Sequence, residues 1–154
     1  MFVPAGAVCK PRRRGFHGGM IRRSRRAFLA RRLVKAGAAD IVHGHSSHHV
    51  KGIEVHRDRL ILHGCGDLIN DYEGIRGHPP YRDDPSLMYF PRLDPATGAL
   101  LELRMAPMRL ERFRLHDAGA GEVRWLLDVL NREGKRLGTR ARRGDDGLLH
   151  LEWD

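Results

Sequence analysis

Two adjoining stretches decide the fold: ADIVHGHSSHHVKGIEV at residues 39–55 and LILHGCGDLIND at residues 60–71. Each contains a short apolar run that leads into glycine and histidine, a pattern that predicts a strand entering a turn. A polar turn at Arg57 and Asp58 separates the last two of the predicted strands. These strands cover residues 40–43, 51–55 and 60–63.

Two amphipathic helices are predicted outside these stretches. The first runs from Ser24 to about Ala36 and ends before Gly37, and these residue types favour the start and the end of a helix. The second covers residues 120–133. Their apolar faces would be formed by Phe28, Leu29, Leu33 and Ala36 in the first helix, and by Val123, Leu126, Leu127 and Leu130 in the second.

Further strands are predicted on either side of the second helix. A turn over residues 94–98 joins two of them into a hairpin. The loop from Gly64 to Pro85 that precedes them is long, and loops of this length in compact domains are often functional. The additional strands cover residues 87–93, 100–105, 108–115, 138–142 and 148–153. Strands interleaved with helices in this way indicate an α/β fold.

Positive charge is concentrated at one end of the chain. The formal net charge is +9, yet residues 1–39 hold eleven of the 28 lysines and arginines and no acidic residue. The remainder therefore has 17 basic residues against 19 acidic ones, which a uniformly basic nucleic-acid-binding domain would not show. We interpret residues 1–23 as a basic, irregular segment and residues 24–154 as the folded part.

Histidines cluster at the first turn. Six of the ten histidines lie between residues 43 and 63, and four of these fall within seven residues. His43 and His45 share a face of an extended chain, whereas His48 and His49 follow at loop distance. Clustered imidazoles after an apolar strand provide convergent nitrogen ligands. The cluster predicts a divalent metal site, and the alternative is a set of surface histidines without a ligand.

The second stretch ends in a loop that offers oxygen ligands. A two-metal centre needs such ligands, and Asp67 and Asn70 would reach the histidines if the strands bring this loop alongside them. Gly66 belongs to the same predicted site loop. The alternative is that both side chains only hydrogen-bond to the loop backbone. Cys65 would be reactive only if it were exposed beside positive charge.

The order of these features resembles the bacterial CapA family of poly-γ-glutamate capsule synthesis, which is similar to the calcineurin-like metallophosphoesterases. The shared pattern is a Gly-Ala-Asp step, an apolar strand, a Gly-His turn, a Gly-Ile-Glu strand and a Gly-Asp loop, and it covers roughly residues 24–135. The resemblance implies a partial metallophosphatase-like α/β sandwich with a C-terminal helix and hairpin. It also implies a metal-dependent, phosphatase-like hydrolase that acts on a small-molecule or polymer substrate.

The resemblance implies that His45 and His48 bind a divalent metal (Mn, Fe or Zn), with His43 or His49 able to substitute. The family usually has His-x-His in this turn, whereas two residues separate His45 from His48 here. The family's upstream Asp-rich and Asn-His motifs have no counterpart in residues 1–38. We therefore expect a C-terminal fragment that is inactive alone, and whether it is an enzyme stays open.

The basic start allows two other interpretations. Ser24-Arg25-Arg26 resembles a twin-arginine export motif, but Arg31 and Arg32 interrupt the apolar segment that export requires. A basic arm could bind a partner or neutralise nucleic-acid phosphates, yet no recognition motif supports nucleic-acid binding. The sequence contains no run of about 18 apolar residues, so no membrane span is predicted. We expect a cytoplasmic location for this chain and membrane-associated or exported full-length relatives.

Overall fold

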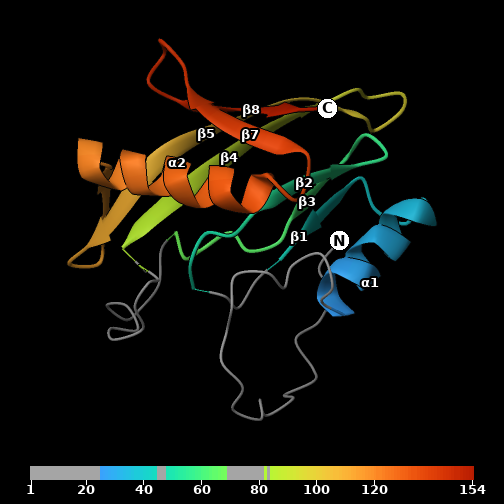
Figure 1. Ribbon diagram of the computed structural model, residues 1–154, viewed down its shortest axis with the longest axis horizontal. Helices are drawn as coiled ribbons and strands as arrows, with labels where there is room; N and C mark the ends of the chain where they lie inside the picture. The colour runs from blue at the N-terminus through green and yellow to red at the C-terminus, as the bar shows by residue number, and fades with distance from the viewer. Residues whose placement is uncertain (1–24, 45–47, 69–81, 83) are drawn as a thin grey trace.

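The computed structural model describes residues 25–44, 48–68, 82 and 84–154. These residues form two helices and eight strands, which confirms the predicted α/β class (Figure 1). In chain order the elements are α1 (Arg25–Lys35), β1 (Ile41–His43), β2 (Ile53–His56), β3 (Arg59–Leu62), β4 (Pro85–Leu93), β5 (Leu100–Glu111), β6 (Arg114–Asp117), α2 (Ala120–Gly134), β7 (Thr139–Arg143) and β8 (Leu149–Trp153). None of the helices in this part of the chain is long and apolar enough to cross a membrane.

The strands predicted from the two deciding stretches are confirmed. Within the described residues they form a three-stranded sheet in the order β1-β3-β2, with β1 parallel to β3 and β2 antiparallel to β3. Arg57 and Asp58 make the tight turn between β2 and β3 with φ values of 52° and 59°. Two successive left-handed residues match the right-handed twist of the flanking strands.

The remaining described strands form a five-stranded sheet, in which β4-β5-β8-β7 are neighbours and β6 pairs with β5. The structure corrects one boundary. Residues 100–105 and 108–115 were predicted as separate strands, but β5 runs unbroken to Glu111 and the chain turns at Arg112 and Phe113. Pro107 does not end β5 because β4 pairs across it and its carbonyl accepts a hydrogen bond from the Ala118 amide at 3.1 Å.

The larger hydrophobic core of the described residues is formed by the five-stranded sheet, by α2, which crosses this sheet, and by residues of β2 and β3 (Figure 1). Leu103, Met105 and Leu149 from the sheet are fully buried, as is Leu126 from α2. The predicted apolar face of α2 is confirmed, with Val123, Leu126 and Leu130 buried and Leu127 packed against them. Trp125 also packs against this core, consistent with a structural role.

The predicted apolar face of α1 is wrong. The residues that α1 buries are Ala27, Ala30 and Val34, and the last two pack against Ile61 of β3. Phe28 and Leu29 are 64% and 55% exposed. Small residues let the helix approach β3 closely, so the contact face follows residue size rather than hydrophobicity alone.

Direct contacts join the two sheets. The Thr139 hydroxyl of β7 donates a buried hydrogen bond of 2.8 Å to the Ile53 carbonyl of β2. The Leu100 amide at the start of β5 donates to the Asp58 carbonyl at 2.7 Å. Leu60 and Leu62 of β3 pack in the larger core and Ile61 packs against α1, so the three-stranded sheet lies between the larger core on one face and α1 on the other.

Candidate functional site

The histidine turn and the second loop lie side by side because β1 and β3 are parallel. Their carboxyl ends meet at one edge of the sheet, with His43 opposite Leu62. The Gly44 amide donates to the Leu62 carbonyl at 2.7 Å, and the Cys65 amide donates to the Gly44 carbonyl at 3.3 Å. A bridge between Val50 and Cys65 then closes the turn against the loop.

Gly44 is the residue that permits this approach. A Cβ atom at position 44 would lie 2.6 Å from the His63 carbonyl oxygen and 2.8 Å from that of Leu62. Both neighbours are backbone atoms of the β3 end and have no side-chain freedom with which to move away. The glycine inside the histidine motif is therefore required by packing at the point where the turn leaves β1.

Two of the predicted site residues are brought together. The Nδ1 atom of His48 lies 2.8 Å from the Oδ2 atom of Asp67, across nineteen positions of sequence. The predicted approach of the Asp67 loop to the histidines is thus observed for this pair. His48 has a φ of 55° and Gly66 a φ of 73°, so both segments turn sharply beside the contact.

The other predicted ligands are placed differently. His43 is exposed at the end of β1, and His49 is half-buried beside Val50. His45 and Asn70 lie outside the described residues, so the predictions that involve them stay predictions. Among the residues that the structure describes, no group of three or more His, Cys, Asp or Glu side chains is arranged to hold a metal ion.

Cys65 lies in this loop as a buried thiol rather than as a reactive one. It is 7% exposed, and burial raises its pKa to about 12. Burial also raises the pKa of Tyr89, whose hydroxyl donates to the Cys65 carbonyl at 3.4 Å. A thiol that stays protonated at neutral pH is a poor nucleophile. Cys65 and Tyr89 therefore support the loop by packing and hydrogen bonding.

Sequence reasoning missed a charged network centred on Glu54 of β2. The Glu54 carboxylate is 5% exposed and accepts hydrogen bonds from Arg31 Nε at 2.6 Å and from a terminal Arg31 nitrogen at 3.1 Å. His63 Nε2 lies 2.9 Å from its Oε2 atom, and His56 Nδ1 lies 4.0 Å from Oε1. We call these four side chains the Glu54 network.

Electrostatics show how strongly the network favours a charged Glu54. Burial alone would raise the pKa of Glu54, but the hydrogen bond from His63 and the ion pair with Arg31 outweigh it and lower the pKa to about 2. Arg31 of α1 is partly buried against Glu54 and so does not belong to the solvent-facing surface of the helix. Alternation along the predicted strand places Glu54 on the face opposite Ile53 and Val55, and no local signal indicated that α1 covers this face.

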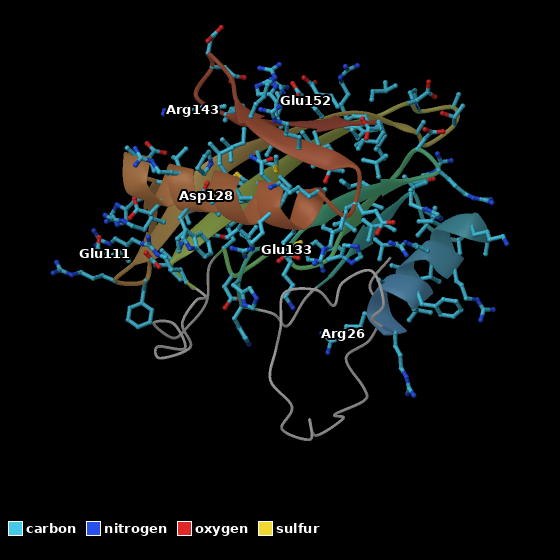
Figure 2. The ribbon with its side chains drawn as sticks, viewed as in Figure 1. Arg26, Glu111, Asp128, Glu133, Arg143 and Glu152 are labelled. Atoms are coloured by element: carbon cyan, nitrogen blue, oxygen red, sulfur yellow. The ribbon has the colours of Figure 1, made fainter. Side chains whose placement is uncertain are left out.

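Charges from both helices also act on Lys51, which lies just before β2. Burial, followed by the charge of Arg26, lowers the pKa of Lys51, whereas Glu133 raises it. Figure 2 labels Arg26 on α1 and Glu133 on α2. The segment that follows the histidine turn is thus subject to the electrostatic field of both helices.

Comparisons with known proteins agree with the placement of these features. Residues 19–72, which include the histidine turn, Glu54 and Asp67, match the family model described as "Bacterial capsule synthesis protein PGA_cap". Two proteins of Mycobacterium tuberculosis, from strains CDC 1551 / Oshkosh and ATCC 25618 / H37Rv, are each named a probable polyglutamine synthesis accessory protein. Each is 45% identical to this chain over 123 residues, which is 80% of this chain and 32% of the relative.

The chain spans about a third of the length of these curated relatives. The aligned 123 residues extend well beyond the family match at residues 19–72. Over residues 19–72 the chain is similar to the bacterial capsule synthesis protein family, and over most of its length it is similar to the two mycobacterial proteins.

Proposed function

We propose that this chain acts in the synthesis of a bacterial capsule polymer, poly-γ-glutamate or a close relative of it. The family match and the names of the two mycobacterial relatives support this role. We further propose that the histidine turn contributes to a divalent metal site in a metallophosphatase-like hydrolase domain. The observation that carries this second step is the contact between His48 and Asp67 at the shared edge of β1 and β3.

The chemistry of the His48–Asp67 contact suits a metal ligand. A carboxylate only accepts hydrogen bonds, so the 2.8 Å contact assigns the ring proton to Nδ1 of His48. The lone pair of the neutral ring is then on Nε2, the atom with which such a histidine binds a metal. Metal-binding histidines usually donate their other ring N–H to a carboxylate or carbonyl, which orients the ring and raises its basicity.

The proposed site takes its other ligands from the same edge of the sheet. His48 would bind Zn, Mn or Fe together with His45, and His43, His49 and Asn70 are further candidates. When bound, the metal polarises a phosphoryl oxygen and lowers the pKa of a bound water. Asp67 would act by holding the His48 ring, and Gly44 and Gly66 by letting the two loops approach.

The match covers only 32% of each relative's length, which bears on the activity of this chain. We propose that hydrolysis needs further ligands from the part of the relatives that this chain does not match. This chain alone would then bind metal without hydrolysing a phosphate ester. Metal binding is therefore the property to measure first.

The test is calorimetric titration of the full chain with Zn²⁺ and Mn²⁺, alongside the His48→Ala and Asp67→Asn variants. We expect His48→Ala to weaken binding at least tenfold, and Asp67→Asn to weaken it by about tenfold through loss of ring orientation. His150→Ala is the matched control, because His150 Nε2 makes a similar contact of 3.0 Å with Asp146 on an exposed hairpin. Wild-type chain that binds neither metal, or equal losses in His48→Ala and His150→Ala, would contradict the metal site.

A further inference from the structure

A second candidate site lies where the three-stranded sheet meets the end of α2. A cavity of about 430 Å³ is lined there by Arg31, Glu54 and His56, and by Arg136, Leu137 and Gly138, which follow α2. The buried hydrogen bond from Thr139 to the Ile53 carbonyl holds its two walls together. Cavities of a few hundred Å³ are of a size that accommodates small ligands.

The cavity is separate from the histidine turn. His56 ends β2 and pairs with Arg59, whereas Ile53 at the other end of β2 pairs with Leu62, which is next to the turn. A ligand in the cavity would therefore bind at the opposite end of β2 from His48 and Asp67. The Glu54 network reaches both ends, because Glu54 contacts Arg31 and also His63.

The charged side chains in the cavity do not cancel. Glu54 is already neutralised, since both of its oxygens accept from Arg31 and Oε2 also contacts His63. Arg31 uses two of its five N–H groups in this ion pair, so three N–H groups remain on a guanidinium whose orientation is fixed. Arg136 is exposed, and its side chain makes no ion pair or hydrogen bond with the rest of the described chain.

We propose that this cavity binds a small oxyanion, a carboxylate or a phosphate group, between Arg136 and Arg31, with His56 at its side. Guanidinium groups present planar sets of donors that match both kinds of anion. Arg31 is held in place by Glu54 before the ligand arrives, so less side-chain freedom is lost on binding. The proposal stands whether or not the histidine turn binds metal.

A structural role for Arg136 is the competing explanation. α2 ends at Gly134, and a positive charge just beyond a helix C-terminus is favoured by the helix dipole. In this role Arg136 would contribute to thermal stability, and its substitution would leave the affinity for anions unchanged. The two explanations therefore separate when ligand binding and thermal stability are measured on the same variant.

The experiment is an NMR titration of the full ¹⁵N-labelled chain with inorganic phosphate in one arm and glutarate in the other, at constant ionic strength set with chloride. We expect saturable shifts of the His56 and Gly138 amides, and about a tenfold weaker affinity in Arg136→Gln. The arm with the tighter binding identifies whether phosphate or carboxylate is preferred. Arg140→Gln is the matched control, since Arg140 is exposed on β7 and does not line the cavity.

Three results would overturn the proposal. One is the absence of saturable shifts with either anion up to about 10 mM. Another is an equal loss of affinity in Arg136→Gln and Arg140→Gln, which would indicate nonspecific attraction by surface charge. The third is a lower melting temperature in Arg136→Gln with unchanged anion affinity, which would assign Arg136 to the helix end alone.

Discussion

The two sheets of this molecule differ in the charge that they bury. The five-stranded sheet packs against α2 through fully buried apolar residues such as Leu103 and Leu126. The three-stranded sheet adds Leu60 and Leu62 to the same core, but it also buries a carboxylate, Glu54, which is neutralised by Arg31 from α1 and contacts His63 after β3. Both sheets therefore build the hydrophobic core, and the smaller sheet also holds a buried charged network.

This difference follows from the cost of burying charge. An apolar side chain stabilises the fold roughly in proportion to the surface it removes from water, whatever its neighbours are. A buried carboxylate stabilises it only if its partners are in place, because an unpaired buried charge is strongly unfavourable. The smaller sheet therefore depends on the position of its charged partners in addition to the apolar packing that both sheets share.

The largest effect is expected in the core of the five-stranded sheet. Leu103→Ala should lower the free energy of unfolding by about 2–5 kcal/mol, because Leu103 is fully buried and its removal leaves a cavity. Leu101→Ala on the same strand is the control, since Leu101 is 46% exposed. Urea unfolding followed by circular dichroism measures both. Similar losses in the two variants would show that this sheet does not depend on the packing described above.

The next effect concerns the Glu54 network. Glu54→Gln should lower the free energy of unfolding by about 2–3 kcal/mol, since it removes the charge that balances Arg31 and weakens two hydrogen bonds. Glu152→Gln is the control, because the Glu152 pair with Arg142 has both side chains more than half exposed. Pairs of that kind contribute about 0–1 kcal/mol. If the two variants unfold at the same urea concentration, the smaller sheet does not depend on its buried charge.

The smallest effect is the part of the pH dependence of stability that comes from the buried Glu54. The pKa of Glu54 falls from 4.5 to about 2 on folding, so its contribution is present above pH 4.5 and is lost as the pH falls towards 2. Between pH 7 and pH 4 the wild type should lose about 1 kcal/mol more than Glu54→Gln. Urea unfolding of both proteins at these two pH values measures this difference. Equal losses of unfolding free energy in the two proteins would show that Glu54 is not the group with the lowered pKa.

Local patterns were sufficient for most of the secondary structure. The turn at Arg57 and Asp58 and the apolar face of α2 were predicted from neighbouring residues alone. Periodicity and turn chemistry depend on a few neighbouring residues, so these features can be predicted from the sequence. Two predictions failed because residues distant in sequence decided the outcome. Pairing with β4 continues β5 beyond Pro107, and α1 packs against β3 through its alanine face rather than through Phe28 and Leu29.

The candidate site was predictable only in part. Clustering identified the histidine turn, and the expected return of Asp67 to it is observed at His48. Glu54 was visible only as one residue of a strand motif, and Arg31 only as a charge that interrupts an apolar segment. Their ion pair joins positions 23 residues apart, and no local pattern predicts such a contact.

The sequence by itself determined the α/β class, the resemblance to a capsule synthesis family, the strands that flank the histidine turn and the candidate metal ligands proposed there. These depend on short-range order along the chain. Only the tertiary structure decided that His48 meets Asp67, that Gly44 must lack a side chain, and that Arg31 neutralises Glu54 beside the cavity. Each of these depends on the parallel pairing of β1 with β3 and on the packing of α1 and α2 around β2, which bring distant residues within bonding distance.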